Sequence, residues 1–482
     1  MPARASRFSR RGVPSNALLA AITISSGLIA SSAADEPPRA FSAPAGLTVH
    51  SSNPGSNPRA DATSDDRLYF GASDPNTGFE LWISDGTATG TRQIKDIRPG
   101  FRGSYPAFIT SFRDRVFFAA DDGANGIELW TTNGSAQGTA LVKDVQPGPN
   151  ASTPNSLTVA GDHLYFVADD GQHGHELWRT DGTADATTLV ADISPGSVGS
   201  MPRHLTAGNH LFFVASDPAA GTEVWVTDGT PSGTRRVSDI NPGSPDTTVH
   251  SLTALNDFLV VVAADEAHGI ELWRTDAQAN TRLIKDIRPG PAASRPRYLQ
   301  RLNDRIYFQA DDGKHGFELW RTDGTERGTQ LVKDIRPGVE SSLPSHLAVV
   351  DNVLFFAAMD GKHGVELWQS DGTTSGTRLT GDINAGTDSS SPGQLTAIGD
   401  ALYFAAGTPA HGWELWSANK RTQALSMMTD VRAGKDSAYP HEFVALGKHI
   451  AFVADDDRGQ ARLWILKPNG ETSLLHSGTS AR

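Results

Sequence analysis

The chain has 482 residues, a formal net charge of −13 and no cysteine. The lack of cysteine excludes disulfides and thiolate metal ligands. The acidic balance disfavours nucleic acid and anionic lipid as partners, so we expect neither.

The N-terminal region has the pattern of an export signal. Residues 1–34 carry four arginines, then an apolar run at 17–30, then small residues up to Ala34. This order predicts a signal peptide over 1–34, and its removal would lower the charge from −13 to −17. The run of 14 residues is shorter than the roughly 20 that a spanning helix needs, so we expect no membrane insertion. The predicted location is secreted, periplasmic or at the cell surface.

After a predicted linker at 35–45, one unit repeats nine times over residues 46–478, and 479–482 form a tail. A Glu-Leu-Trp tripeptide or a close variant returns every 47 or 48 residues. A period of this length is typical of solenoids and propellers. The tryptophans that mark it are Trp82, Trp130, Trp178, Trp225, Trp273, Trp320, Trp368, Trp416 and Trp464.

Each unit reads as four extended segments. The second, such as residues 164–168, is apolar at every position, so both of its faces should be covered. The third segment, residues 176–180, places alternate side chains on opposite faces. It ends at Asp181-Gly182, which predicts a hairpin turn. The fourth, residues 331–335, ends at Pro337-Gly338, which breaks the ladder. We therefore predict an all-β fold, a single β-propeller of nine four-stranded blades. A different blade count or an open arc is the alternative.

The ring also has to close between its first and last units. Residues 46–52 read like a fourth strand, and the ninth unit has a weak fourth segment. We expect residues 46–52 to pair with the third strand of the ninth unit near 463–466. The alternative gives that place to residues 472–476.

The repeat resembles a known bacterial family, the ELWxxDGT repeat proteins, whose repeats occur in exported proteins. ELWISDGT begins at Glu80, ELWRTDGT at Glu176 and Glu318, and ELWQSDGT at Glu366. The resemblance covers about residues 45–475 and is weakest at Arg462-Leu463-Trp464. It implies an exported repeat scaffold with no assigned chemistry.

The repeated residues have a structural and a functional interpretation. We interpret the nine tryptophans as a core layer between blades, with a ring of sugar-stacking aromatics as the alternative. The glutamate two residues before each tryptophan, replaced only at Arg462, is expected to pair with a neighbouring blade. The aspartates that end the fourth strands are expected to bind backbone N–H groups of the turn. They are Asp96, Asp144, Asp192, Asp239, Asp286, Asp334, Asp382 and Asp430.

The loop between the second and third segments carries the metal candidates. His173, His268, His315, His363 and His411 occupy matched positions, and a zinc ring would need them to meet at one point. Oxygen donors of the same loops, Asp121, Asn125 and Glu128, are calcium candidates. We expect plain turn chemistry in these loops and no cofactor.

The function predicted is binding. No nucleophile elbow, zinc-protease pair or phosphate-binding loop occurs in the sequence. We expect an exported, monomeric binding or surface-scaffold propeller that presents its face loops to a protein or glycan, and not an enzyme. The alternative is a secreted propeller enzyme that acts on glycans or esters.

Overall fold

A computed structural model describes residues 48–50, 63–64, 66–242, 246–419 and 424–475. All of them belong to one compact unit, Ala40–Arg482. The predicted signal peptide at 1–34, the linker at 35–45 and the tail at 479–482 lie outside the described residues. No helix in these ranges is long and apolar enough to cross a membrane.

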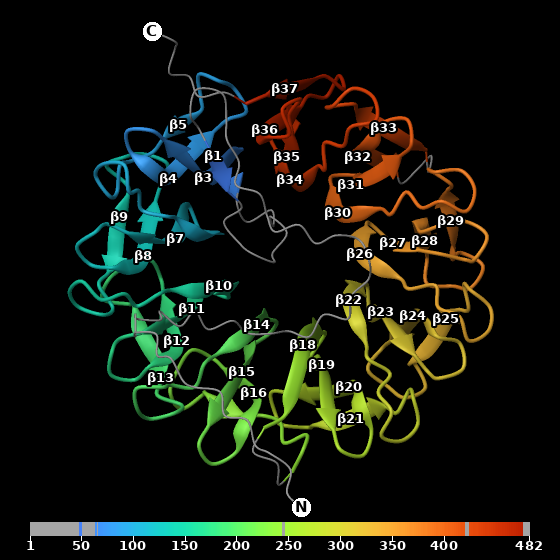
Figure 1. The fold of residues 1–482 in the computed structure, drawn as a ribbon. Helices are drawn as coiled ribbons and strands as arrows, with labels where there is room; N and C mark the ends of the chain where they lie inside the picture. The colour runs from blue at the N-terminus through green and yellow to red at the C-terminus, as the bar shows by residue number, and fades with distance from the viewer. Residues whose placement is uncertain (1–47, 51–62, 65, 243–245, 420–423, 476–482) are drawn as a thin grey trace, which may run out of the picture. The chain divides into compact units, whose positions relative to one another are not determined.

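The described residues form nine antiparallel sheets that follow one another around a ring (Figure 1). The prediction of a nine-bladed all-β propeller is confirmed. In eight blades four strands are paired in chain order, from the centre of the ring to its outer edge, and in the first blade both β1 and β2 pair with β3 at the inner position.

Each strand has a fixed place in its blade. The innermost strands are β1 (Thr48–His50), β2 (Thr63–Ser64), β6 (Ala107–Phe112), β10 (Asn155–Ala160), β14 (Arg203–Ala207), β18 (Thr248–Leu255), β22 (Arg297–Leu302), β26 (Ser345–Val350), β30 (Gly393–Ile398) and β34 (His441–Leu446). The second strands are β3 (Arg67–Asp74), β7 (Arg115–Asp121), β11 (His163–Asp169), β15 (Leu211–Asp217), β19 (Phe258–Asp265), β23 (Arg305–Asp311), β27 (Val353–Ala358), β31 (Ala401–Thr408) and β35 (His449–Asp455). The third strands are β4 (Gly78–Ser84), β8 (Ile127–Thr132), β12 (His175–Thr180), β16 (Gly221–Thr227), β20 (Gly269–Asp276), β24 (Phe317–Thr322), β28 (Glu366–Ser370), β32 (Gly412–Asn419) and β36 (Ala461–Leu466). The outer strands are β5 (Arg92–Gln93), β9 (Ala140–Lys143), β13 (Thr188–Ala191), β17 (Arg235–Arg236), β21 (Arg282–Lys285), β25 (Gln330–Lys333), β29 (Arg378–Gly381), β33 (Leu425–Thr429) and β37 (Thr472–Leu474).

The core consists of nine apolar clusters, one in each interface between neighbouring blades. The second strands supply side chains to both of their faces. In β7 the five central residues are all buried, because Val116 and Phe118 face the first blade while Phe117 faces the third. The apolar runs in the sequence are therefore strands covered on both sides, as predicted.

Closure of the ring differs from the expectation. β1 lies beside β36 but pairs with β3, with Val49 opposite Ala72. The place next to β36 is filled by β37, with Ile465 opposite Ser473. The prediction for residues 46–52 was wrong, and the alternative holds. Packing of Leu68 and Phe70 against Val453 and Leu463 closes the ring instead.

The repeated TDGTxxGT letters build the loop between the third and outer strands. In the sixth blade Thr325 donates its N–H to the Asp323 carboxylate at 2.9 Å, and the hydroxyls of Thr322 and Thr329 lie 2.7 Å apart. A Cβ at Gly328 would overlap that carboxylate, which explains the second glycine of the motif. The loop thus satisfies its own polar groups within one tight turn.

Candidate functional site

The nine tryptophans lie between blades. Trp82, Trp130, Trp178, Trp320 and Trp368 are buried, and the other four are half-buried against the same kind of cluster. A lysine at the end of the preceding unit covers some of them: Lys95, just after β5, has its Nζ 5.7 Å from the Trp130 ring and donates to Thr139 O at 2.9 Å. These contacts tie adjacent blades together and leave little ring surface for a sugar.

Each repeated glutamate of the third strand is a buried hydrogen-bond acceptor. Glu318 accepts the N–H groups of Ile335 at 3.0 Å and Ser342 at 2.9 Å, and the Ser342 hydroxyl at 2.6 Å. These donors lie in the connection that leads to the next blade. The pairing expected with a neighbouring blade was wrong, because the donors are neutral and belong to the connection that follows the glutamate's own blade. Burial raises the pKa of four such carboxyls to about 7, those of Glu80, Glu271, Glu318 and Glu414.

Five of the eight aspartates that follow the outer strands contact the next turn. Asp286 Oδ2 accepts the Gly290 N–H at 3.0 Å, and Asp382 accepts that of Gly386 at 3.0 Å. The same bond occurs at Asp144, Asp334 and Asp430, with distances of 3.2 to 3.5 Å.

The structure does not bring the calcium candidates together. Asp121 accepts the Gly123 N–H at 2.6 Å and pairs with Arg98 of the preceding blade. The Asn125 amide donates to Asp122 at 2.8 Å, and the Glu128 carboxylate is buried against its own connection. In the part of the chain that the structure describes, no cluster of three or more potential metal-ligating side chains occurs.

The five loop histidines are equally separate. Four of them pair with the aspartate three residues earlier, as His173 does with Asp170 at 2.7 Å. His411 pairs with Asp430 at 3.0 Å. Four imidazoles thus brace their own loop, His411 contacts the end of the outer strand of its blade, and the ring needed for a shared zinc ion is not formed.

One face of the ring exposes apolar side chains, which the repeat pattern did not predict. Strands alternate in direction, so the connections between blades leave from the same face as the loops between second and third strands. Of the ten large apolar side chains exposed in the described ranges, eight lie on this face. They are Phe101, Tyr105, Ile127, Val198, Met201, Val339, Leu343 and Tyr439. We call this set the apolar face residues.

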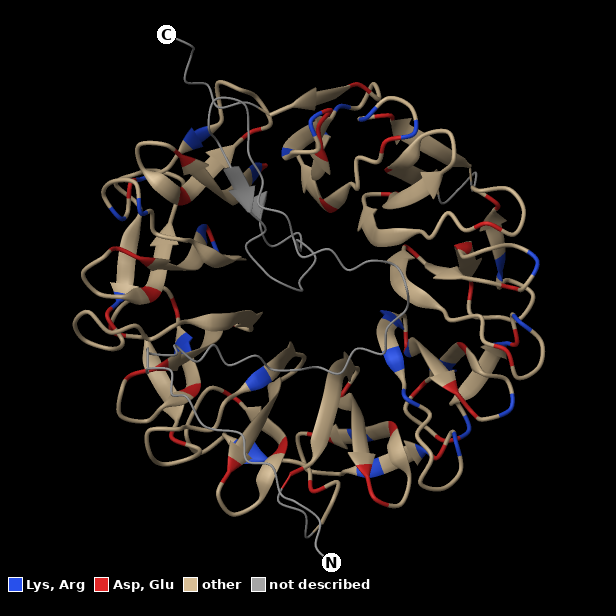
Figure 2. Cartoon of the chain, viewed as in Figure 1, with Lys and Arg blue, Asp and Glu red and all other residues tan. Residues whose placement is uncertain are grey.

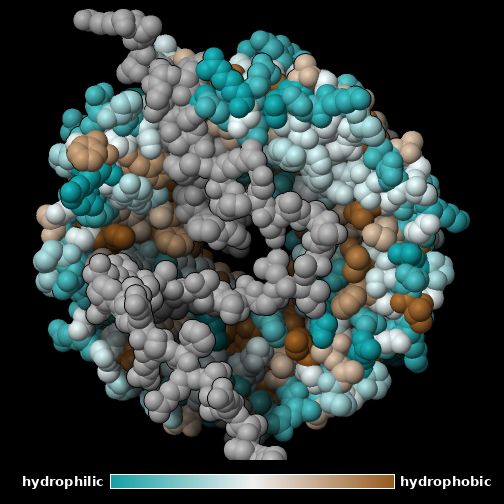
Figure 3. Space-filling view, viewed as in Figure 1, coloured by the Kyte–Doolittle hydropathy of each residue, from teal (hydrophilic) through white to brown (hydrophobic). Residues whose placement is uncertain are grey.

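One repeated position of the connections has a strained backbone whether its residue is apolar or polar, since Thr153, Arg295 and Ser391 there have φ between 46° and 51°. Tyr105, Met201, Leu343 and Tyr439 each precede a proline and have φ between 47° and 52°. Non-glycine residues in this left-handed region cost free energy and need a reason to persist. Phe101, Val198 and Val339 are 68 to 79% exposed near the tips of the same connections. In Figure 3 the outer edge is mainly hydrophilic, and hydrophobic patches lie mostly nearer the centre.

The innermost strands of four consecutive blades carry a second unpredicted group. Figure 2 shows basic residues on β14 and β22 at the inner side of the ring. Burial lowers the pKa of His204 and His250, and the nearby charges of Arg203 and Arg297 lower them further. Tyr298 stacks on His346 with the ring centroids 6.2 Å apart. This group contains no carboxylate pair of the kind that glycoside hydrolysis uses.

A fold of nine sheet blades with self-contained loops defines a β-propeller repeat protein. The family model described as "Outer membrane protein assembly factor BamB" matches residues 213–478, more than half of the chain. The chain belongs to this family. No curated protein is found to match it.

Several solved structures are similar to the chain at low identity. A prolyl endopeptidase has 13% identity over 73% of this chain and 54% of its own, with a TM-score of 0.42. Puromycin hydrolase has 13% over 68% and 54%, with a TM-score of 0.34. The β-propeller domain of the Trilobed protease from Pyrococcus furiosus has 12% over 68% and 99%, with a TM-score of 0.35. The chain spans about half the length of the first structures it matches. Similarity at this level carries no functional argument.

Proposed function

We propose that the chain is an exported β-propeller that binds a protein partner through its apolar face residues. The observation that carries this proposal is the distribution of exposed apolar side chains, eight of ten on one face. Exposed apolar groups that gather on one side of a soluble fold mark an interaction surface, because water alone does not favour them there.

The loops supporting this face suit recognition. Met201 donates its N–H to His175 O at 3.0 Å and Leu343 donates to Phe317 O at 3.1 Å, so each connection is fixed to the loop beside it. A fixed loop loses little conformational entropy when it binds. Eight similar connections arranged in a ring would give a partner a broad, pre-formed surface.

Export and family membership support the same proposal. The predicted signal peptide at 1–34 would deliver the chain outside the cytoplasm, and the matching family model describes an outer membrane assembly factor. We further propose that the chain is a monomeric ELWxxDGT repeat protein with no nucleic-acid partner. N-terminal sequencing of the exported protein checks the cleavage near Ala34.

Site-specific photo-crosslinking in cells tests the surface. A photoreactive amino acid at Phe101 or Val339 should give adducts with a defined protein partner. Val159 is the matched control, because it is exposed and apolar but lies at the opposite end of its strand, beside the turn to β11. Equal adducts at Val159, or adducts at none of the three positions, would contradict the proposal. Binding of the purified chain to glycans, unchanged by Phe101→Ser and Val339→Ser, would favour a glycan-binding module instead.

A further inference from the structure

The ninth blade breaks the pattern of buried glutamates. In its third strand the equivalent residue is Arg462, whose side chain is only 4% exposed. Its Nε donates to Asp456 Oδ2 at 2.9 Å, and its Nη2 donates to Gln460. Its Nη1 is buried and has no hydrogen-bond partner among the described residues.

A buried guanidinium N–H without a partner is unfavourable. Leaving a buried charged donor unsatisfied costs at least about 1 to 3 kcal/mol. Asp456 cannot serve it, since Oδ1 already accepts the N–H groups of Arg458 at 2.9 Å and Gln460 at 3.0 Å. Those bonds and Arg462 lower the pKa of Asp456 against the effect of burial, so it is fully ionised at neutral pH.

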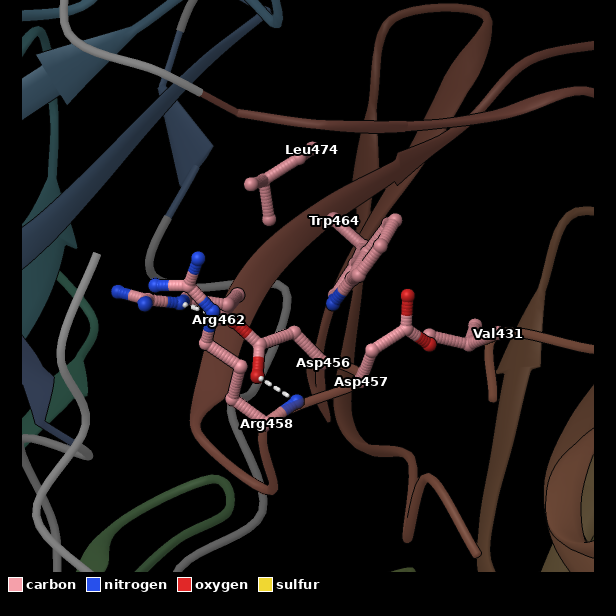
Figure 4. Close-up of a pocket in the computed structure, with 7 residues that line it drawn as sticks. All are labelled: Val431, Asp456, Asp457, Arg458, Arg462, Trp464 and Leu474. Carbon is pink, nitrogen blue, oxygen red and sulfur yellow. Dashed lines mark hydrogen bonds and ion pairs between the residues drawn. The ribbon is translucent and has the colours of Figure 1, made fainter. Parts of the chain in front are cut away.

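Arg462 is also one of the residues that line a pocket of about 330 Å³. This volume is at the lower end of the range of small-molecule sites. Its lining is Val431, Asp456, Asp457, Arg458, Arg462, Trp464 and Leu474. Figure 4 shows the guanidinium groups of Arg458 and Arg462 on one side, and Asp457 and Trp464 on the other.

The two sides of the pocket have opposite charge. Within the described ranges the side chains of Arg458 and Asp457 form no ion pair. The Trp464 indole is held in place, because its Nε1 donates to Ala454 O at 3.0 Å. Trp464, Val431 and Leu474 make up the apolar part of the lining.

We propose that this pocket binds a small zwitterion with an apolar side chain, such as a free amino acid or the ends of a short peptide. Its carboxylate contacts the exposed guanidinium of Arg458, beside the buried positive charge of Arg462, because guanidinium groups match carboxylates in geometry and charge. Its ammonium group contacts Asp457, and its side chain lies against Trp464. This site does not depend on the apolar face residues or on the function proposed for them.

Calorimetric titration of the full exported chain tests the ligand class. The probes are L-phenylalanine, N-acetyl-L-phenylalanine, L-phenylalaninamide and the dipeptide Phe-Phe. Phenylalanine or the dipeptide should bind, and blocking either charge should weaken binding at least about tenfold, as expected for a lost charge-assisted hydrogen bond. If phenylalanine binds more tightly than the dipeptide, the ligand is a single amino acid; if the dipeptide binds more tightly, the ligand is a short peptide. No binding of either at millimolar concentration, or equal binding of the blocked forms, would overturn the proposal.

Variants locate the site. Arg458→Gln and Asp457→Asn change exposed side chains and should each weaken binding about tenfold or more while the melting temperature stays unchanged. Arg327→Gln is the matched control, an exposed arginine in a loop of the sixth blade. Arg462→Gln should abolish binding if it folds, and if it unfolds the two exposed variants decide. Wild-type affinity in both exposed variants, or an equal loss in Arg327→Gln, would refute the assignment.

Discussion

The buried glutamates should make the propeller less stable as the pH rises from 5 to 8. A carboxyl whose pKa is higher in the folded than in the unfolded chain holds its proton more tightly when folded. Its contribution therefore favours folding fully below pH 4.5 and disappears as the pH rises through about 7. The difference between 4.5 and about 7 corresponds to about 3.4 kcal/mol for one site.

Between pH 5 and pH 8 one such site should lower the free energy of unfolding by about 2.5 kcal/mol. Glu318→Gln removes one titrating carboxyl. Between pH 5 and pH 8 the free energy of unfolding of this variant should therefore fall by about 2.5 kcal/mol less than that of the wild type. At pH 5 the variant should be about 1 to 3 kcal/mol less stable than the wild type, because an amide nitrogen facing Ile335 N–H cannot accept its hydrogen bond.

Denaturant unfolding at several pH values measures this effect. Glu340→Gln is the control, since that carboxylate is exposed on the surface and its removal should leave the pH dependence unchanged. If the wild type is equally stable at pH 5 and 8, the buried carboxyls do not bind protons as argued. If Glu318→Gln keeps the wild-type slope, Glu318 is not one of the groups responsible.

Three further outcomes are expected. Trp320→Ala should lower the free energy of unfolding by about 3 to 5 kcal/mol, measured by denaturant titration, because it removes a buried aromatic side chain and leaves a cavity. Gly328→Ala should lower the melting temperature by displacing Asp323 from its turn, whereas Ala186→Gly at the equivalent place of the third blade should not. In the third blade the Ala186 nitrogen lies 3.3 Å from the Thr183 hydroxyl, whereas the Gly328 nitrogen lies 3.0 Å from the Thr325 hydroxyl. The loop of the third blade is thus slightly wider and accommodates alanine. Calcium or a chelator should leave the melting temperature unchanged, because the loop carboxylates bind N–H groups; a chelator-dependent shift in calorimetry would show ligation instead.

Most of the fold was predictable because each repeat contains all the strand and turn signals of one blade. The apolar run at 164–168 identified a strand covered on both faces, and the motif that starts at Asp181-Gly182 identified a turn. These signals lie within one unit, so the same strand and turn pattern could be identified in each of the nine copies.

Ring closure was harder, because two segments had the same local pattern. Both 46–52 and 472–476 read as a fourth strand, and the sequence pattern favoured 46–52, which was wrong. β37 follows β36 after a five-residue turn, so its pairing closes a very short loop. Pairing β1 with β36 would instead join positions about 400 residues apart, with a larger loss of chain entropy. This difference favours the local hairpin.

The surface sites were not predicted from the repeat because they depend on departures from it. Phe101 and Val339 stand directly after Pro-Gly, where most units have other residues. An apolar residue at this variable position was a usable signal. The pocket at Arg462 needed the structure, since only three-dimensional packing shows that a replaced charge is buried and lacks a partner.

The way in which the ring closes has a mechanical consequence. No backbone pairing joins the first and ninth sheets in the described ranges, and their contact is an apolar interface. At the other eight interfaces the chain itself connects the two sheets, whereas the first and ninth sheets are held by packing, so this interface can part while each blade keeps its strands. Under mechanical force or in mild denaturant, the interface between the first and ninth blades, where Leu68 packs with Leu463, should therefore open before the other interfaces.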